Sequence, residues 1–367
     1  MHPIKEFDFK GLDKLLSLEF IKLHNSIYRN LKLIKDNNLG NQTIINYLNI
    51  YFTEFDILTE NDEKLVFDTI ICASKSKINK LSTINFNQNI KLHCSKLTYL
   101  EMYEKLADKK DKLERITTRT NAQNNELKSI STKLDSQITF LDLIGKIFDY
   151  SAKRKFLLMY FSSMNYKVCV YCLAQNTSIY KSNKKKEFYL TGNLDHVKPK
   201  SKFPFISLSI NNLVPVCGHC NQRKLDRNFK YDPFNSFHIH NFDFSKCVDY
   251  NMDKSEIEFK GLADLEITPK TGDFIDLSKE LDFENLYKNF SKNAELLTER
   301  FRNFNSLTYK EMIENTMIEN TNNRNIHNSA LEYFISEVPF SEDSILMFPL
   351  IKFKMDLYNH LKNISKK

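Results

Sequence analysis

Residues 192–227 read GNLDHVKPKSKFPFISLSINNLVPVCGHCNQRKLDR, and this stretch decides the expected fold. A β-type run here ends in an acid–histidine pair, Asp195-His196. A second apolar run, Leu213–Val216, leads into a pair of cysteines, and a short basic helix is expected to open at Asn221 and to end near Arg227. The stretch therefore predicts two short strands followed by a helix, with polar side chains at the strand and helix ends.

Four cysteines form two Cys-x-x-Cys pairs, Cys169-Val-Tyr-Cys172 before this stretch and Cys217-Gly-His-Cys220 inside it. Two residues between thiolates allow both sulfurs of one turn to face one ion, and two such pairs complete a tetrahedral four-sulfur zinc site. A thioredoxin-type redox role would explain one pair and leave the other idle. The spacing therefore predicts one structural zinc ion held by all four cysteines.

The remaining cysteines and two nearby histidines are expected to be structural. Cys72 and Cys94 stand in apolar, helical contexts and are predicted core residues, whereas Cys247 has no partner at ligand spacing. His238 and His240 alternate like the residues of a strand, and we interpret them as structural.

The polar residues of the stretch each have an ordinary alternative. A buried histidine after an aspartate is commonly a satisfied structural residue, Asn212 taken alone is a turn residue, and Asn221 taken alone is a helix cap. Only their order and spacing, together with the four cysteines, favour a chemical role over these alternatives.

In that order and spacing, Asp195-His196, Asn212-Leu-Val-Pro, Cys217-Gly-His-Cys-Asn221 and Lys224 resemble the HNH endonuclease family. The resemblance covers residues 166–232 and implies a ββα-metal fold around one divalent ion. It implies that His196 is the general base, that Asp195 and Asn221 hold the catalytic ion, that Asn212 braces the loop that orients His196, and that Lys224 contacts the phosphate.

One position departs from the family pattern: the third position of the HNH motif is a histidine in that pattern, and here it is Asn221. Many family members carry asparagine there, so the implied metal site is retained. His219, inside the second cysteine pair, is an alternative ligand, although its side chain is expected to point away from the site.

The chemistry explains these residue types. A phosphodiester is anionic and resists attack, so hydrolysis needs a water deprotonated near neutral pH and a cation on the scissile phosphate. A neutral histidine suits the first task, and oxygen ligands suit a hard ion such as Mg²⁺ or Mn²⁺, which keeps several waters. Zinc, by contrast, is expected only to staple the two strands and the helix together.

The distribution of charge favours a nucleic-acid partner, with a solvated basic face as the alternative, and the expected nucleic acid is double-stranded DNA. Residues 151–230 hold 15 lysines and arginines against three acidic residues, whereas the rest of the chain is net acidic although the total is +7. Residues 181–186, KSNKKK, are expected either to grip phosphate or to form a solvated hairpin tip.

The fold class predicted for the whole chain is α+β and mainly helical, with the central zinc-stapled HNH domain between helical flanks. Four segments are expected: a helical domain at 1–150, the nuclease domain at 151–235, a small β-containing connector at 236–280 and a helical region at 281–367. Finer expectations concern a helix start at Thr59–Glu63, a long polar helix over 99–134, an apolar helix over 141–164, a strand pair over 257–277 and a loop over 315–328.

Composition excludes several classes of protein. Only seven glycines occur, and no two are close enough to form a phosphate-cradling loop, so neither a P-loop nucleotidase nor a Rossmann domain is expected. No run approaches the ~20 apolar residues that span a bilayer, and the first residues lack the apolar core of a secretory signal. A cytoplasmic location with reduced cysteines is therefore expected.

A wider pattern resembles one group of HNH proteins in particular. The segments 194–224 and 347–352 are similar to the HNH subunits of bacterial anti-phage defence pairs such as Septu, in which an ATPase works beside the nuclease. An ATPase partner docked on the helical flanks is the implied arrangement. The alternatives are a stand-alone restriction, homing or RNA-directed HNH nuclease, and a catalytically dead zinc-dependent DNA-binding scaffold.

Overall fold

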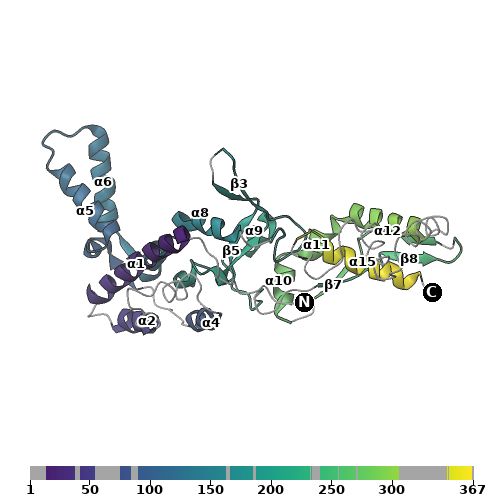
Figure 1. Cartoon of the computed structure of the whole chain (residues 1–367). Coiled ribbons are helices and arrows are strands. Elements are labelled where there is room, and N and C mark those ends of the chain that lie inside the picture. Colours follow the sequence, from purple (N-terminus) through teal and green to yellow (C-terminus); the bar gives the residue numbers. More distant parts are fainter. Residues whose placement is uncertain are drawn as a thin grey trace. The chain divides into compact units, whose positions relative to one another are not determined.

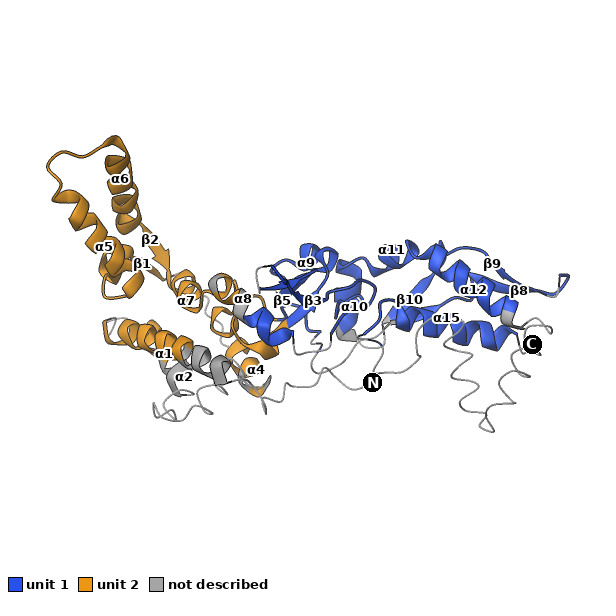
Figure 2. Ribbon diagram, turned by 45° about the horizontal axis from the view of Figure 1, so that its top comes forward, with its two compact units in different colours: residues 1–5, 155–197, 214–367 blue, residues 6–154, 198–213 orange. Residues whose placement is uncertain are grey.

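The computed structural model divides the chain into two compact units, which Figure 2 colours separately. One unit comprises mainly residues 155–197 and 214–367, and the other comprises residues 6–154 and 198–213. The predicted division into four segments stays a prediction. The structure describes residues 14–37, 42–53, 75–83, 90–162, 166–184, 187–231, 233, 240–254, 256–269, 272–305, 345 and 347–365.

Several predicted features lie outside these described residues: the helix start at Thr59–Glu63, Cys72, His238 and the loop over 315–328. Among the elements that the structure does describe, helices dominate and the strands are short, in agreement with the predicted α+β class. No helix in the described part of the chain is long and apolar enough to cross a membrane.

The unit that comprises residues 6–154 and 198–213 is mostly helical (Figure 1). Apolar residues three and four positions apart, such as Ile27, Leu31 and Ile34, form the buried face of its first helix. Its elements are α1 (Lys14–Asn37), α2 (Gln42–Thr53), α4 (Lys75–Thr83), β1 (Lys91–His93), η1 (Cys94–Leu97), α5 (Glu101–Glu114), α6 (Asn121–Asp135), β2 (Gln137–Thr139), α7 (Phe140–Phe148), the first part of α8 (Tyr150–Phe161), η2 (Pro204–Ile206) and η3 (Ile210–Asn212).

The polar stretch over 99–134 forms two helices that pack on each other, so the prediction of one long helix is wrong. The second helix, α6, has its own start signal, a capping box in which the Thr120 hydroxyl accepts from the Gln123 backbone while the Gln123 side chain accepts from the Thr120 backbone. These local hydrogen bonds satisfy backbone donors that a continuous helix would have used. Cys94, predicted to be a core residue, is buried in this unit.

The apolar stretch over 141–164 is also divided, into α7 and α8. The break falls at Asp149, whose backbone angles of φ 12° and ψ 69° are not helical. A single apolar pattern therefore runs through two helices, because the sequence period continues across the break while the backbone turns.

Among its described residues, the other unit carries four two-stranded sheets, which pair as β3–β4, β5–β6, β7–β10 and β8–β9. Its elements, in chain order, are β3 (Ile179–Lys181), β4 (Phe188–Leu190), β5 (Asn193–His196), β6 (Leu213–Val216), α9 (Gly218–Lys224), β7 (His240–Asp243), β8 (Val248–Asn251), β9 (Glu256–Phe259), β10 (Glu266–Pro269), α10 (Gly272–Glu280), α11 (Phe283–Lys288), α12 (Ser291–Asn305) and α15 (Ile351–Ile364). The predicted strands around Asp195 and over Leu213–Val216 are thus confirmed.

The strand pair predicted over 257–277 is wrong in its partners. Strand β9 pairs with β8 before it, and β10 pairs with the still earlier β7, so that Ile267 lies opposite Phe242. The end of the predicted range is helical, because α10 begins at Gly272. The sequence spacing showed two strands but could not show that each pairs with an upstream strand.

One hydrophobic core contains the four cysteines of the two Cys-x-x-Cys pairs together with residues of the C-terminal helices of this unit. Aromatic rings of Phe242, Phe244, Tyr287 and Phe353 pack in edge-on and stacked pairs within the same buried cluster as the cysteines. The backbone N–H of Leu350 donates to the carbonyl of Leu173, 2.9 Å away, which ties the start of α15 to the first cysteine turn. Cys247 is buried in this core as well.

Candidate metal centre and active site

Strands β5 and β6 approach so closely that only glycine fits at position 192. A Cβ atom built on Gly192 would lie 2.1 Å from the carbonyl oxygen of Val216. The strand that follows Gly192 therefore runs directly against the strand that leads into the second cysteine pair. This contact fixes Asp195 and His196, at the end of β5, relative to the start of helix α9.

The four cysteine sulfurs form a closed, buried cluster. All four Sγ atoms lie within 4.8 Å of one another, and those of Cys172 and Cys217 are 3.8 Å apart. Zinc–sulfur bonds of about 2.3 Å in tetrahedral geometry place sulfurs about 3.8 Å apart, so the spacing fits Zn²⁺. Among the described residues no other group of three or more histidine, cysteine or acidic side chains is clustered for a metal.

The protonation of these thiols also fits a cation. Hydrogen bonds from Cys169, Cys172 and Cys220 lower the pKa of Cys217, whereas burial raises the pKa of Cys172. Without a cation, the thiolate of Cys217 is thus stabilised by hydrogen bonds from the neighbouring thiols, whereas burial opposes ionisation of Cys172. A divalent ion supplies the positive charge that allows all four sulfurs to be thiolates.

Each cysteine pair is shaped by its local backbone. In the first turn, the N–H of Leu173 donates to the carbonyl of Cys169 at 2.9 Å, and Leu173 adopts a left-handed conformation with φ 56°. In the second, Cys217 is the N-cap of α9, and its sulfur accepts from the N–H of Cys220 at 3.4 Å. Helix α9 therefore begins at Gly218, and the expectation that Asn221 opens it is wrong, because the cysteine already caps it.

The Asp195 carboxylate is buried and held by two side-chain donors. The Tyr171 hydroxyl donates to Asp195 Oδ2 at 2.7 Å, and Lys224 Nζ lies 3.0 Å from the same oxygen. Burial raises the pKa of Asp195, while the charge of Lys224 and the Tyr171 hydrogen bond oppose that rise. Lys224 Nζ also donates to the backbone carbonyl of His196 at 2.7 Å.

The position of Lys224 differs from the expected one. Its side chain is only 2% exposed, and its ammonium group is engaged inside the domain by Asp195 and by the His196 carbonyl. An amine held in this way does not face a phosphate in solvent. We therefore correct the expected phosphate contact: in this structure Lys224 organises the acid–histidine pair from within.

Asn212 is buried and braces the loop that follows His196 in the sequence. Its Oδ1 accepts from the N–H of Lys198 at 2.8 Å, and its Nδ2 donates to the carbonyls of Lys198 and Ile206, each at 3.1 Å. The amide thus closes the 198–212 loop from both sides. The geometry is that of a loop brace, and its link to the orientation of His196 stays a prediction.

Asn221 lies in the middle of α9, one turn after the capping cysteine, and its side chain is half-buried. Its backbone takes part in the helix, whereas its amide has no hydrogen bond to any of the residues that the structure describes. The amide oxygen is therefore available to a ligand from outside the protein.

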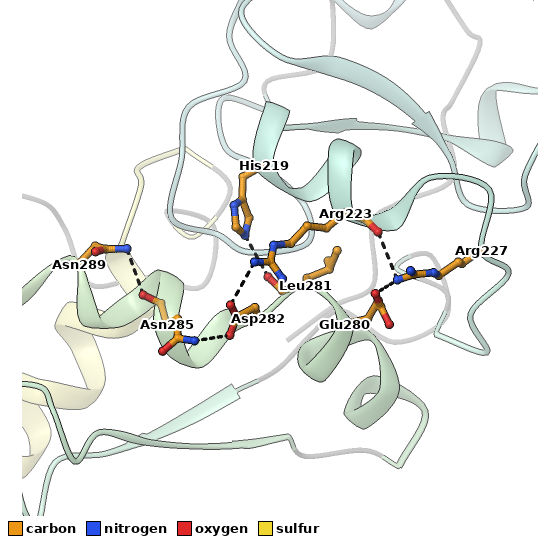
Figure 3. Close-up of polar contacts among 8 residues, drawn as sticks. All are labelled: His219, Arg223, Arg227, Glu280, Leu281, Asp282, Asn285 and Asn289. Atoms are coloured by element: carbon orange, nitrogen blue, oxygen red, sulfur yellow. Dashed lines mark hydrogen bonds and ion pairs between the residues drawn. The ribbon is translucent and has the colours of Figure 1, made fainter.

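His219 contacts the segment between α10 and α11, and the expectation that it points away from the acid–histidine pair stays a prediction. Figure 3 shows His219 and Arg223 of α9, and Arg227 just after it, reaching the end of α10 and the start of α11. His219 lies 3.0 Å from the Leu281 carbonyl, Arg223 pairs with Asp282 at 3.2 Å, and Arg227 pairs with Glu280. These contacts tie α9 and the residues after it to the segment between α10 and α11, and the alternative role of His219 as a ligand stays untested.

Comparison with known families decides what this constellation is. Residues 169–227 match the family model of the HNH endonucleases. The chain therefore carries an HNH endonuclease domain. No curated protein and no solved structure matches the chain.

Within the HNH domain, the structure brings Asp195, His196 and Lys224 together beside the four cysteines. It adds Tyr171, which the sequence interpretation treated only as a spacer in the first cysteine pair. No sequence signal marks this role, because the partner of the hydroxyl is 24 positions away and on another element.

Proposed function

We propose that the chain is a metal-dependent HNH endonuclease that hydrolyses the phosphodiester bonds of DNA. The observation that carries the proposal is the Asp195–His196 pair, which ends β5, contacts Lys224 of α9 and lies with the four-cysteine site within residues that match the HNH family model. Zinc in this assignment is structural, and Cys169, Cys172, Cys217 and Cys220 hold it.

His196 is the proposed general base. In its neutral form the imidazole accepts a proton from a water molecule while the water oxygen attacks phosphorus, and the leaving oxygen of the next nucleotide departs as the bond breaks. Lys224 donates a hydrogen bond to the His196 carbonyl, and the Asn212 side chain accepts one from the backbone of Lys198, two residues later. Both contacts hold the backbone at and after His196. Positioning of this kind supports general-base catalysis.

Asp195 and Asn221 are the proposed ligands of the catalytic ion, Mg²⁺ or Mn²⁺. The chemistry of the donors fits, because a carboxylate oxygen and an amide oxygen are hard ligands and these ions keep several waters. The amide of Asn221 has no hydrogen bond within the described residues, and the printed contacts of Tyr171 and Lys224 with the Asp195 carboxylate both fall on its Oδ2. When bound, the ion would stabilise negative charge on the phosphate and on the leaving oxygen.

A nucleic acid is the proposed substrate because positive charge is concentrated on the HNH domain, and DNA is the nucleic acid that we propose. The KSNKKK stretch begins at the end of β3 in the β3–β4 hairpin, where the side chains of Lys181 and Lys184 are exposed, and its last two lysines, 185 and 186, lie outside the described residues. Tyr180, 53% exposed, stacks on Tyr189 in the same hairpin. Exposed lysines neutralise phosphate, so the hairpin is the proposed DNA contact outside the catalytic residues.

We also propose that this nuclease is the cytoplasmic effector of an anti-phage defence pair and works with an ATPase. The sequence likeness to the HNH subunits of systems such as Septu supports this role, as does the absence of a phosphate-binding glycine loop from the sequence. Co-expression with an ATPase encoded beside it and recovery of a stable complex would test the pairing. A stand-alone restriction, homing or RNA-directed enzyme would cut without that partner.

Cleavage of plasmid DNA by the zinc-loaded protein tests the central proposal. His196→Ala is expected to slow Mg²⁺- or Mn²⁺-dependent cleavage by on the order of 10²–10⁴-fold while zinc content stays the same. An RNA substrate of matched sequence separates DNA from RNA cleavage. Equal cutting by wild type and His196→Ala would refute the assignment, and inactive but DNA-binding wild-type protein would point to a catalytically dead scaffold.

A further inference from the structure

We propose that Tyr171 and Lys224 are positioning residues that link the four-cysteine site to the site of the catalytic ion. They do so by holding one oxygen of Asp195 from two sides. The inference rests on the proposed function in one respect, namely that Asp195 is a ligand of that ion. Nothing in the family match assigns a role to Tyr171.

The two donors converge on a single atom. Tyr171 OH and Lys224 Nζ approach Asp195 Oδ2 at 2.7 and 3.0 Å, and both side chains are almost completely buried. Hydrogen bonds to a charged acceptor in a water-poor environment are strong and directional. The carboxylate is therefore fixed in one orientation by two side chains that both hold Oδ2, and the backbone of His196 adds a further hydrogen bond to the same carboxylate.

The donors come from the two halves of the zinc site. Tyr171 lies between the two cysteines of the first pair, and Lys224 ends the helix that the second pair begins. The same Lys224 ammonium group also holds the His196 carbonyl. A shift of the first cysteine pair would thus move Asp195 through the Tyr171 hydrogen bond. A shift of the second pair would move both Asp195 and His196 through Lys224.

It follows that the role of the zinc site extends beyond stabilising the packing of the strands on the helix. It sets the orientation of the carboxylate that we assign to the catalytic ion, through partners outside that ion's own ligands. Removal of such partners typically weakens metal binding or activity 10–100-fold. We therefore expect Tyr171 to affect affinity for the catalytic ion while having little effect on zinc.

The matched control is a second buried tyrosine on the same cysteine turn. The Tyr287 hydroxyl donates to the carbonyl of Cys172 and is completely buried, but it approaches the turn without reaching Asp195. Tyr171→Phe and Tyr287→Phe each remove one buried hydroxyl from this turn. A purely structural role predicts similar effects, whereas a positioning role predicts an effect on the catalytic ion from Tyr171→Phe alone.

The experiment measures Mn²⁺ binding to the zinc-loaded full chain by electron paramagnetic resonance, with zinc content and thermal midpoint determined in parallel. Asp195→Asn identifies the relevant Mn²⁺ signal. We expect Tyr171→Phe to weaken that binding about 10-fold or more at unchanged zinc content, and Tyr287→Phe to leave it within about 2-fold of wild type. Lys224→Met is expected to lower cleavage at saturating Mn²⁺ as well, because the His196 carbonyl loses its donor.

Unchanged Mn²⁺ affinity in Tyr171→Phe, equal losses in the two tyrosine variants, or wild-type Mn²⁺ binding that Asp195→Asn does not alter would each overturn the inference. These outcomes are independent of catalysis. Mn²⁺ binding that depends on Asp195 and Tyr171, without any cleavage of DNA, would support the positioning role and refute the proposed nuclease activity.

Discussion

Gly192→Ala tests the close contact that places the acid–histidine strand. The added Cβ would lie 2.1 Å from the carbonyl oxygen of Val216 and 3.2 Å from a methyl carbon of Thr177. The first of these atoms is backbone, so relief requires strand β5 or β6 to move by about 1 Å. Overpacking against side chains alone costs about 1–3 kcal/mol, and a clash with backbone lies at or above the top of that range.

The expected loss of about 3 kcal/mol corresponds to a fall of about 6–12 °C in the thermal midpoint for a unit of this size. Because Val216 precedes Cys217, we also expect reduced zinc retention during purification. Gly218→Ala is the control within the same unit, since a Cβ at this helical position meets nothing within 4 Å. That variant is expected to match wild type or to gain up to about 1 kcal/mol.

Differential scanning fluorimetry and zinc analysis of the three proteins measure both effects. A thermal midpoint for Gly192→Ala within about 2 °C of wild type, with full zinc content, would refute the reasoning. It would mean that the two strands have room to separate and that their pairing does not fix Asp195.

Four further predictions concern other parts of the chain. Cys172→Ser should lower zinc from about one ion per chain and reduce the thermal midpoint, and full zinc in that variant would contradict the four-sulfur site. Replacing Lys181 and Lys184 with alanine should reduce the slope of log affinity for DNA against log salt by up to about 2 in a fluorescence titration, and an unchanged slope would exclude the hairpin as a phosphate contact. Asn212→Ala should destabilise the protein by about 2–4 kcal/mol in urea denaturation, because buried backbone groups of Lys198 and Ile206 lose their partner. Gly145→Ala, in the interior of α7 with open space around it, should raise stability by about 0.5–1 kcal/mol in the same assay.

The features that sequence predicted well are those specified by short-range spacing. Two Cys-x-x-Cys pairs need only a turn each to direct their sulfurs inward, so residue spacing alone indicated the cluster that the structure shows. Strands β5 and β6 were likewise found because short apolar runs stand between polar ends. The match of residues 169–227 to the HNH family agrees with this local information.

The features that sequence missed depend on tertiary contacts. Nothing in the residue type of Lys224 distinguishes an amine exposed to a phosphate from one buried against Asp195, since the difference lies in which face of α9 packs inward. The pairings of β9 and β10 with upstream strands depend on the chain path in the same way. The division of 99–134 into two helices did have a sequence signal, namely the Thr120-x-x-Gln123 capping box.

The hydrogen bond between Leu350 and Leu173 has a consequence for synthesis of the chain. The two residues are 177 positions apart, and at roughly 5–20 residues per second a ribosome needs roughly 9–35 s to pass from one to the other. The last of the four thiols, Cys220, is synthesised 130 residues before Leu350, so all four exist for roughly 7–26 s while the aromatic core that buries them is incomplete. Newly made chains therefore offer these thiols to zinc, or to an oxidant, for seconds before the core closes over them.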